Sequence, residues 1–482
     1  MPAQTILDYL KEYAHLAPNK PLLGDLGGWL TTSQVLERVE SSAGKLYGLG
    51  LRSGDWTVLQ MAQTADAVTM LLALQTLGAV AVLTDGRMPL GEVFASTQRE
   101  ISFVICDTDQ GFMIKHNGNT AIINRAVSVP YAPCTDPCGP GMVIFTSGST
   151  GKSKGVILSQ NNLISNLLAS APLGGYYEDD VALGALPMDH VFGLALLTGS
   201  IVLRHSLFLT SGKDLDSLLD TIEKQRITRM NGVPSLYLTM AARRGDYDLS
   251  SLRCGFIGGG PCTPAQFETI ENELSMTLVP VYGMSECVGI SCGDHLAPRS
   301  VRANGVGPFY AVNEGKILRD DGSVVAIGET GEVCVRGPQR MIGYCDAEQT
   351  AAAIDADGFL HTGDLGFVDE SGILHLTGRK RDIIIRNGVN LSARKIEEAL
   401  LSIPGVTDAM VVGLTHEVQG EVPCAMVQSE LSEKVLLARL SKILYKNEIP
   451  VEIHVVPSLP YTPGGKPDKI KGKELLESWE KA

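Results

Sequence analysis

The chain has 482 residues, of which 44% are hydrophobic and 20% are charged. This composition is typical of a folded globular protein and excludes an intrinsically disordered one, and the length allows one large domain and one small domain. The net charge of −14 and the pI of about 5.2 argue against general binding to nucleic acid, which requires an excess of lysine and arginine.

The cysteines and the apolar segments bear on the cellular compartment of the protein and on whether it spans a membrane. Ten cysteines are scattered between Cys106 and Cys424, and their spacing matches no paired zinc-ligand pattern. We therefore expect free thiols in a reducing, cytoplasmic environment. Residues 1–16 lack the apolar core of a signal peptide. The most apolar stretch, residues 65–84, contains Asp66 and Gln75, so we expect a buried helix and strand rather than a membrane span.

The first part of the chain alternates between helical and strand-like patterns. We expect a helix over residues 33–49, a strand over 56–60, a second helix over 65–77 and a second strand over 79–83. This alternation predicts an α/β fold, in which a large N-terminal domain contains doubly wound, mostly parallel sheets.

The pattern changes near residue 355, where short strands separated by turns begin. Residues 365–368 and 373–376 flank the sequence DESG, which is typical of a hairpin. The segment after it predicts a strand at 383–385, a helix around 393–402, a strand at 409–413 and a terminal helix.

A charged segment, Gly378 to Asp382, separates these two kinds of pattern. We place the domain boundary at residues 379–382. The large N-terminal domain then spans residues 1–380, and a small C-terminal α+β domain spans residues 381–482.

A segment rich in small residues follows an apolar strand expected at 142–145. It runs from Thr146 to Gly155 with the sequence TSGSTGKSKG. Glycines and hydroxyl residues let backbone N–H groups turn toward an anion, while Lys152 and Lys154 add positive charge. A Walker A loop would need glycine at position 146, where this chain has threonine. The segment therefore predicts a phosphate-binding loop of another kind, and the alternative is a flexible surface loop.

Two further segments follow predicted strands. Residues 258–261 (GGGP) follow one, and residues 282–286 (YGMSE) follow another at 278–281. Considered separately, the glycines could form a plain turn and Tyr282 could pack in the core. Glycines also allow backbone to lie flat on one face of a purine, and a tyrosine can stack on the other face.

Two later segments contain candidate polar groups. Residues 361–364 (HTGD) place Asp364 at a strand end, where it could merely cap a turn. Residues 459–466 (LPYTPGGK) form a loop rich in proline and glycine that ends at Lys466. That lysine could be solvated and idle, but a reaction that joins two anions needs a cation to bridge them.

Together and in this order, the five segments resemble the signature of the adenylate-forming superfamily. This superfamily comprises acyl- and aryl-CoA synthetases, adenylation domains of peptide synthetases and firefly-type luciferases. The resemblance covers roughly residues 30–470. It departs from the usual pattern at Ser153, which replaces a proline, at Ser285, which replaces a threonine, and at Lys395, which replaces a glutamate. It implies that the small domain rotates about a hinge.

The resemblance implies a site for ATP, and for the AMP formed from it. Tyr282 would stack on adenine, Asp364 would bind the ribose hydroxyls with support from Arg379, and Glu286 would bind Mg²⁺. Lys466 would be the catalytic lysine. The implied nucleotide-binding set is Thr146, Ser147, Gly148, Ser149, Thr150, Gly151, Lys152, Lys154, Gly259, Gly260, Tyr282, Gly283, Ser285, Asp364 and Arg379.

Residues 186–193 (LPMDHVFG) resemble the segment that enters the acyl pocket of these enzymes. His190 would be a gating ring and a third catalytic candidate, and the alternative is a histidine packed in the core at a helix start. Val191 stands where amino-acid-activating relatives tend to carry Asp, which disfavours an α-amino acid substrate, although Asp189 could also face the pocket. The expected pocket consists of His190, Val191, Gly258, Met284 and Cys287, and its character suits a fatty or aromatic acid.

By the same resemblance, the small domain would rotate about Arg381 after adenylation. The rotation would withdraw Lys466 and bring Gly388 to the thiol tunnel. CoA is the first choice of acceptor, and the phosphopantetheine of an acyl carrier protein is the second. We therefore expect an ATP- and Mg²⁺-dependent acid–thiol ligase. The alternatives are a P-loop ATPase or kinase, a non-catalytic nucleotide-binding relative and an adenylating oxygenase of the luciferase type.

Overall fold

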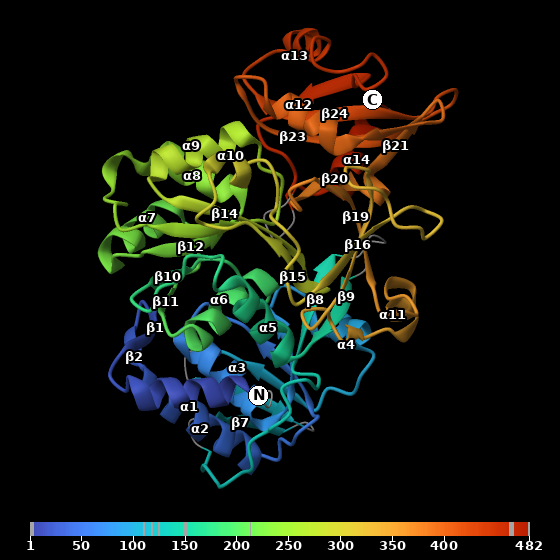
Figure 1. The fold of residues 1–482 in the computed structure, drawn as a ribbon. Helices are drawn as coiled ribbons and strands as arrows, with labels where there is room; N and C mark the ends of the chain where they lie inside the picture. The colour runs from blue at the N-terminus through green and yellow to red at the C-terminus, as the bar shows by residue number, and fades with distance from the viewer. Residues whose placement is uncertain are drawn as a thin grey trace.

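The computed structural model describes residues 4–108, 111–116, 119–123, 126–147, 153–212, 214–461 and 467–480. The large N-terminal part contains two eight-stranded sheets and a four-stranded sheet, and the C-terminal part contains a separate five-stranded sheet (Figure 1). No helix within these ranges is long and apolar enough to cross a membrane.

The first large sheet has a parallel centre. In spatial order its strands are β15 (Cys287–Cys292), β14 (Thr277–Met284), β13 (Cys254–Ile257), β12 (Arg229–Gly232), β10 (Val181–Gly184), β11 (Ser206–Leu209), β1 (Pro21–Asp25) and β2 (Gly28–Thr31). All neighbours from β14 to β1 run parallel, and the edge strands β15 and β2 pair antiparallel.

The second large sheet is parallel only at its centre. Its spatial order is β18 (Gly343–Tyr344), β9 (Ser153–Leu158), β8 (Met142–Ser147), β4 (Val80–Thr84), β3 (Trp56–Gln60), β5 (Phe103–Cys106), β6 (Met113–His116) and β7 (Asn119–Ile122). The strands from β8 to β5 are parallel, whereas the strands at both edges pair antiparallel. The predicted α/β fold is confirmed, with antiparallel edges that the sequence analysis did not foresee.

Helices fill the space between the two sheets and cover their outer faces. The inner helices are α1 (Ile6–Leu16), α2 (Thr32–Gly48), α3 (Ala65–Leu77), α5 (Gln160–Ser170) and α6 (Val191–Val202). On the outer faces, α7 (Leu215–Gln225), α8 (Pro234–Arg243) and α9 (Pro264–Leu274) cover the first sheet, and α4 (Leu90–Thr97) covers the second. Shorter helical segments are η2 (Arg244–Asp246), α10 (Arg299–Arg302) and α11 (Ala347–Ala353).

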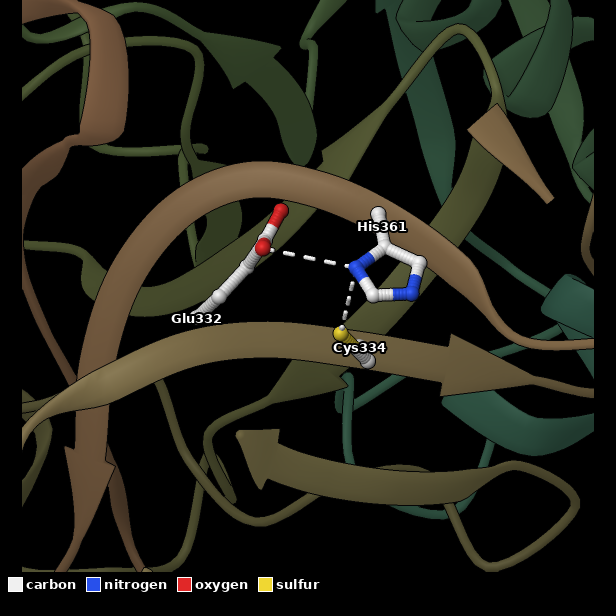
Figure 2. Close-up of side chains that lie close together, drawn as sticks. All are labelled: Glu332, Cys334 and His361. Atoms are coloured by element: carbon white, nitrogen blue, oxygen red, sulfur yellow. Dashed lines mark hydrogen bonds and ion pairs between the residues drawn. The ribbon is translucent and has the colours of Figure 1, made fainter. Parts of the chain in front are cut away.

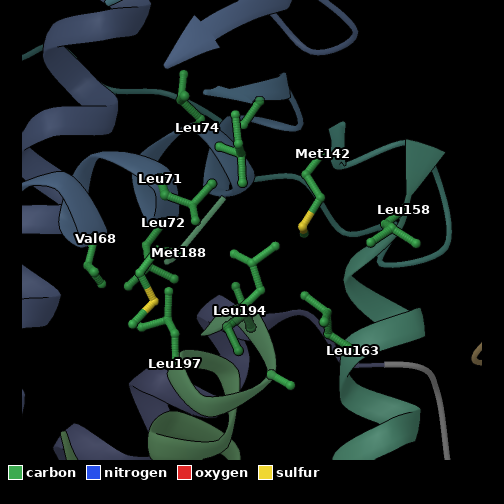
Figure 3. Packing of buried hydrophobic residues seen from close by; sticks show 14 of the residues in the cluster. Val68, Leu71, Leu72, Leu74, Met142, Leu158, Leu163, Met188, Leu194 and Leu197 are labelled. Atoms are coloured by element: carbon green, nitrogen blue, oxygen red, sulfur yellow. The ribbon is translucent and has the colours of Figure 1, made fainter. Parts of the chain in front are cut away.

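Helix α3 lies at the centre of this core and has the bounds expected from the sequence. Thr64 caps its first turn by accepting a hydrogen bond from the Ala67 N–H, and Gly78 ends it with a φ of +73°. All its residues except Asp66 are buried. Its leucines and valine pack against Met188 and the side chains of α6 (Figure 3). A helix buried on nearly every face explains why this stretch is apolar throughout rather than along one stripe.

The four-stranded sheet and the C-terminal domain follow each other in the chain. The four-stranded sheet is antiparallel and consists of β16 (Glu314–Leu318), β17 (Gly331–Arg336), β19 (Leu360–Val368) and β20 (Leu374–Arg379). The C-terminal domain contains β21 (Ile383–Arg386), β22 (Val389–Ser392), β23 (Val406–His416), β24 (Gly420–Ser429), β25 (Glu452–Val455), α12 (Ala393–Leu401), α13 (Glu433–Leu440) and α14 (Lys469–Glu480). The predicted hairpin of β19 and β20 is confirmed.

Between the two sheets lies a single helical turn, η3 (Lys380–Asp382). One sheet ends at Arg379 and the next begins at Ile383. The change of sheet therefore falls in the segment where the sequence analysis placed the boundary.

A buried ion pair holds β12 against the segment that leads into β10. Arg229 is fully buried, with its Nη1 3.2 Å from Asp180 Oδ2 and its guanidinium 3.6 Å from the centre of the Tyr176 ring. Burial alone would raise the pKa of Asp180, but the hydrogen bond from Thr228 and the charge of Arg229 outweigh it and hold that pKa below its usual value. The ionised carboxylate is therefore favoured in the folded chain, and the stability it contributes is lost as the pH falls through this lowered pKa.

We expect Asp180→Asn to lower the free energy of unfolding by about 3 kcal/mol, because it leaves the buried Arg229 without its counter-charge. Urea-induced unfolding followed by fluorescence measures the change. Asp179→Asn is the control, since Asp179 is 76% exposed and pairs with Arg253 at the surface. Equal losses in the two variants would contradict a special role for the buried pair.

Candidate active site

A cleft of about 1980 Å³ lies between the C-terminal domain and the ends of several strands of the large N-terminal part. On the N-terminal side it is lined by the segments that follow β12 and β13, by the end of β14 and by β19 and β20. On the C-terminal side it is lined by residues of α12, β23 and α14. Ligands of open α/β sheets bind beyond the carboxyl ends of parallel strands, and β12, β13 and β14 all end here.

One side of the cleft is built around the carboxylate of Asp364. Asp364 lies directly opposite Arg379 in the β19–β20 hairpin, and Arg379 Nε is 3.0 Å from Asp364 Oδ1. The other oxygen, Oδ2, accepts a hydrogen bond of 2.7 Å from the hydroxyl of Tyr282 at the end of β14. Burial and the nearby Asp364 carboxylate hold the pKa of Tyr282 well above its usual value, so its hydroxyl stays a donor. A tyrosine ring, a carboxylate and a guanidinium thus meet at one point.

A second carboxylate, that of Glu286, faces the same cleft from the turn after β14. Glu286 is 8% exposed, and its Oε1 accepts a hydrogen bond of 2.7 Å from the hydroxyl of Tyr344 in β18. The ammonium of Lys154 lies 5.1 Å from the centre of the Tyr344 ring. Burial and Glu286 raise the pKa of Tyr344. A hard anionic oxygen and a cation therefore both lie beside Tyr344, near the start of β9.

The loop after β13 needs glycine for a reason that the structure makes clear. A Cβ added to Gly258 would lie 2.9 Å from the carbonyl oxygen of Val281, closer than a real Cβ comes to a backbone atom. Gly259 has a φ of +80°, a conformation that other residues rarely adopt. Both residues line the cleft together with Gly260. The loop therefore offers bare backbone to a flat ligand.

Most predicted nucleotide-binding residues that the structure describes lie along this cleft. Its lining includes Thr146, Lys154, Gly258, Gly259, Gly260, Tyr282, Gly283, Met284, Ser285, Glu286, Asp364, Arg379 and Arg381. Thr146 and Lys154 are directly opposite each other in the β8–β9 pair, and the backbone of Ser147 pairs with Ser153. Gly148, Ser149, Thr150, Gly151, Lys152 and Lys466 lie outside the described residues.

Of the predicted residues that the structure describes in full, four are not among those that line the cleft. His190 is the N-cap of α6 and Val191 is its first residue. Cys287 is fully buried, and its thiol lies 3.5 Å from the carbonyl oxygen of Gly289. Gly388 forms the β21–β22 turn together with Asn387. Their expected roles in the acyl pocket and the thiol tunnel remain predictions.

Asp189, next to His190, is half-buried, and burial raises the pKa of its carboxyl group.

Two residues that shape the site, Tyr344 and Thr362, are absent from the set predicted from the sequence. Tyr344 contacts Glu286 across 58 positions of sequence, and nothing local marked it. The Thr362 hydroxyl accepts a hydrogen bond of 3.1 Å from the Asp364 N–H and donates one of 2.7 Å to the Val333 carbonyl. Thr362 stands inside the HTGD segment, so its hydroxyl beside the carboxylate was an available signal.

Comparison with known families accounts for both parts of the chain. The model of the AMP-binding enzyme matches residues 10–345, and that of the AMP-binding enzyme C-terminal domain matches residues 395–466. The chain belongs to the AMP-binding enzyme family. The resemblance to adenylate-forming acyl- and aryl-CoA synthetases is thereby confirmed.

Relatives in this family are similar over nearly their whole length. A 2-succinylbenzoate–CoA ligase of Bacillus cereus (strain Q1) is 31% identical over 98% of this chain and 99% of its own. The structure of o-succinylbenzoate CoA synthetase from Bacillus subtilis, in complex with its acyl-adenylate intermediate, is 26% identical with a TM-score of 0.85 and covers 97% of both chains. ATP-bound MatB from Rhodopseudomonas palustris is 25% identical with a TM-score of 0.87 and covers 97% of this chain and 99% of its own.

Proposed function

We propose that this protein is an AMP-forming acid–thiol ligase that uses ATP, Mg²⁺ and CoA. In the first reaction, a carboxylate oxygen attacks the α-phosphorus of ATP, the bond to the β-phosphate breaks, and acyl-AMP and pyrophosphate form. In the second, the sulfur of CoA attacks the acyl carbon, a proton leaves the thiol, and AMP departs. The relatives named above that are CoA ligases support this proposal.

The observation that carries the proposal is the meeting of Tyr282, Asp364 and Arg379 at the cleft. Asp364 is 7% exposed and pairs with a guanidinium, and its oxygens can accept hydrogen bonds from vicinal hydroxyls such as those of ribose. Gly259 and Gly260 line the same cleft. This arrangement suits a nucleoside and has no evident purpose in the packing of the core.

The groups near Glu286 fit a magnesium nucleotide. Mg²⁺ prefers oxygen ligands and commonly takes one carboxylate together with phosphate oxygens and waters. Glu286 would hold the cation, which would neutralise charge on the phosphates. Lys154 and Thr146, opposite each other at the ends of β9 and β8, would contact phosphate oxygens.

We also propose that residues 381–482 form a mobile domain that rotates about Arg381. Tyr461 and Pro467, which flank the segment containing Lys466, line the cleft, whereas Gly388 is not among its lining residues. This arrangement supports a pose suited to adenylation. Gly388 has a φ of +77°, and an added Cβ there would have no neighbour within 4 Å, so the turn is free to approach a pantetheine arm after rotation.

The acid and the acceptor are the finer parts of the proposal. An aromatic acid of the 2-succinylbenzoate type is the first candidate, because the relatives at about 31% identity act on it. CoA is the acceptor that these relatives support, and they give no support to a carrier protein. A cytoplasmic location is retained as part of the proposal because no disulfide is found within the described residues, as a reducing compartment favours.

The decisive experiment measures pyrophosphate release with ATP and Mg²⁺ across a panel of carboxylic acids that includes 2-succinylbenzoate, benzoate and fatty acids, each with and without CoA. The expected result is acid-dependent release that rises with CoA, together with formation of an acyl-CoA. Release without any acyl-CoA would favour a different acceptor. No release with any acid, while the protein still binds ATP, would contradict the proposed activity.

We expect Asp364→Asn to raise the KM for ATP roughly 10–100-fold, because a charge-assisted hydrogen bond contributes about 1.5–3 kcal/mol. Steady-state kinetics with varied ATP measures the effect. Asp369→Asn is the matched control, since Asp369 lies in the same hairpin and pairs with His375. A KM for ATP that is equal in the two variants would argue against a ribose contact at Asp364.

A further inference from the structure

A second cluster of polar side chains lies on the four-stranded sheet and takes no part in the proposed reaction. It consists of Glu332 and Cys334 of β17 and His361 of β19 (Figure 2). Cys334 and His361 are directly opposite each other in the antiparallel pair, and Glu332 precedes Cys334 by two positions. Strand geometry therefore points all three side chains to one face of the sheet. They offer a carboxylate oxygen, a thiol and an imidazole nitrogen.

The distances within this cluster match the edges of a tetrahedral metal site. His361 Nδ1 lies 3.5 Å from Cys334 Sγ and 3.3 Å from Glu332 Oε2, and all three ligand atoms lie within 4.8 Å of one another. In a tetrahedral zinc site, bonds of about 2.3 Å to sulfur and about 2.0–2.1 Å to nitrogen and oxygen place sulfur about 3.6 Å and oxygen about 3.3 Å from the nitrogen. The two distances from His361 Nδ1 thus already have the values expected of a tetrahedral site.

The surroundings of His361 have the form that holds a metal-binding imidazole. Its other nitrogen, Nε2, lies 3.5 Å from Asp355 Oδ2. A carboxylate on the far nitrogen fixes the ring and the tautomer that leaves Nδ1 free to bind a metal. His361 is 36% exposed in its side chain, whereas Cys334 is fully buried, so a cation could enter from the histidine side.

The ammonium group of Lys380 lies next to this cluster and pairs with one of the proposed ligands, Glu332. Lys380 Nζ lies 3.3 Å from Glu332 Oε2, but it also lies 2.8 Å from Asp320 Oδ1. Lys380 can therefore keep a counter-charge on Asp320 when Glu332 turns to a metal. With Glu332, Asp355 and Asp320 nearby, the local charge stays negative and favours a divalent cation.

We propose that Glu332 Oε2, Cys334 Sγ and His361 Nδ1 form a binding site for a thiophilic, tetrahedral divalent cation of the zinc class, with water as the fourth ligand. A cysteine ligand selects zinc over magnesium, which prefers oxygen, so this site is chemically distinct from that at Glu286. Glu332 also accepts a hydrogen bond of 3.1 Å from the Gly363 N–H, and Lys380 belongs to η3. Metal binding would therefore change contacts of both the HTGD segment and the linker between the domains.

Cobalt substitution of the full-length protein tests the site. We expect Co²⁺ to give a sulfur-to-metal charge-transfer band and strong visible bands of a tetrahedral complex, with one Co²⁺ bound per chain and displaced by one Zn²⁺. Cys334→Ser should abolish the charge-transfer band, and Glu332→Gln should weaken Zn²⁺ binding at least tenfold. Asp355→Asn should weaken it roughly 10–100-fold, as loss of a partner on the far nitrogen does.

Cys106→Ser is the matched control, because it removes another cysteine that lies on β5 in the second large sheet. It should leave the cobalt spectrum and the Zn²⁺ stoichiometry unchanged. Circular dichroism of each variant checks that the fold is retained, and Glu332→Gln keeps the test valid if the buried cysteine variant misfolds. Absence of the charge-transfer band in the unaltered protein, or an unchanged band in Cys334→Ser, would overturn the proposal.

Discussion

Replacement of Glu286 by glutamine is expected to lower acid-dependent pyrophosphate release roughly 10²–10³-fold at a fixed Mg²⁺ concentration, because a metal bound to the phosphates contributes several kcal/mol to catalysis. Glutamine keeps the size of the side chain and an oxygen that can accept the hydrogen bond from Tyr344. The change therefore removes charge and little else. Initial rates over a range of Mg²⁺ concentrations measure the effect, and part of the loss should be recovered at high Mg²⁺.

Tyr344→Phe is the matched control for this change. It removes the hydrogen bond that Glu286→Gln can keep, but it leaves the carboxylate of Glu286 intact, and we expect it to lower the rate less than tenfold. If Tyr344→Phe were as damaging as Glu286→Gln, a loss of that size would not require removal of the charge. The assignment of Glu286 to magnesium would then fail.

Replacement of Lys466 by alanine is expected to separate the two half-reactions. Formation of acyl-AMP should fall roughly 10²–10³-fold, because a cation that stabilises charge moving between the carboxylate and the α-phosphate would be lost. Formation of the thioester from supplied acyl-AMP and CoA should keep its rate, because Lys466 would be withdrawn in that step. Pyrophosphate release measures the first half, and acyl-CoA formation from synthetic acyl-AMP measures the second.

Lys471→Ala serves as the control for a general loss of positive charge. Lys471 is an exposed residue of α14 that lines the same cleft. It should leave both half-reactions within about twofold of their original rates, as surface substitutions usually do. Loss of both halves in Lys466→Ala, or of neither, would be inconsistent with alternation of the small domain.

The central elements of the fold could be predicted because their signals are local. The strand at 56–60 and the helix at 65–77 have the predicted bounds, and Thr64 and Gly78 supply the cap and the stop that the pattern suggests. The antiparallel meander of β5, β6 and β7 and the long strand β24 were not foreseen. Their positions depend on pairing with other strands, and register between strands is set by contacts that a local pattern does not contain.

In the candidate site too, residues with a local sequence signal could be predicted, whereas residues placed by contacts between distant segments could not. Tyr282, Asp364 and Arg379 could be singled out because each stands in a segment with a recognisable sequence, and they meet in the structure. Tyr344 could not, because its contact with Glu286 arises only when β18 adds to the edge of the second sheet. Cys334 could not be singled out as a metal ligand either, because no second cysteine stands near it in the sequence. It comes close to His361 only through the register of the β17–β19 pair.

The described groups proposed to hold the nucleotide all precede Lys380 in the chain. Tyr282, Glu286, Asp364 and Arg379 belong to the large N-terminal part, and η3 begins at the residue after Arg379. If the small domain turns about η3, these four residues stay behind. An acyl-adenylate is a mixed anhydride that water can destroy, and in this arrangement it would remain anchored while its surroundings are exchanged. The reactive intermediate would therefore stay bound until the thiol attacks and would not dissociate into solution.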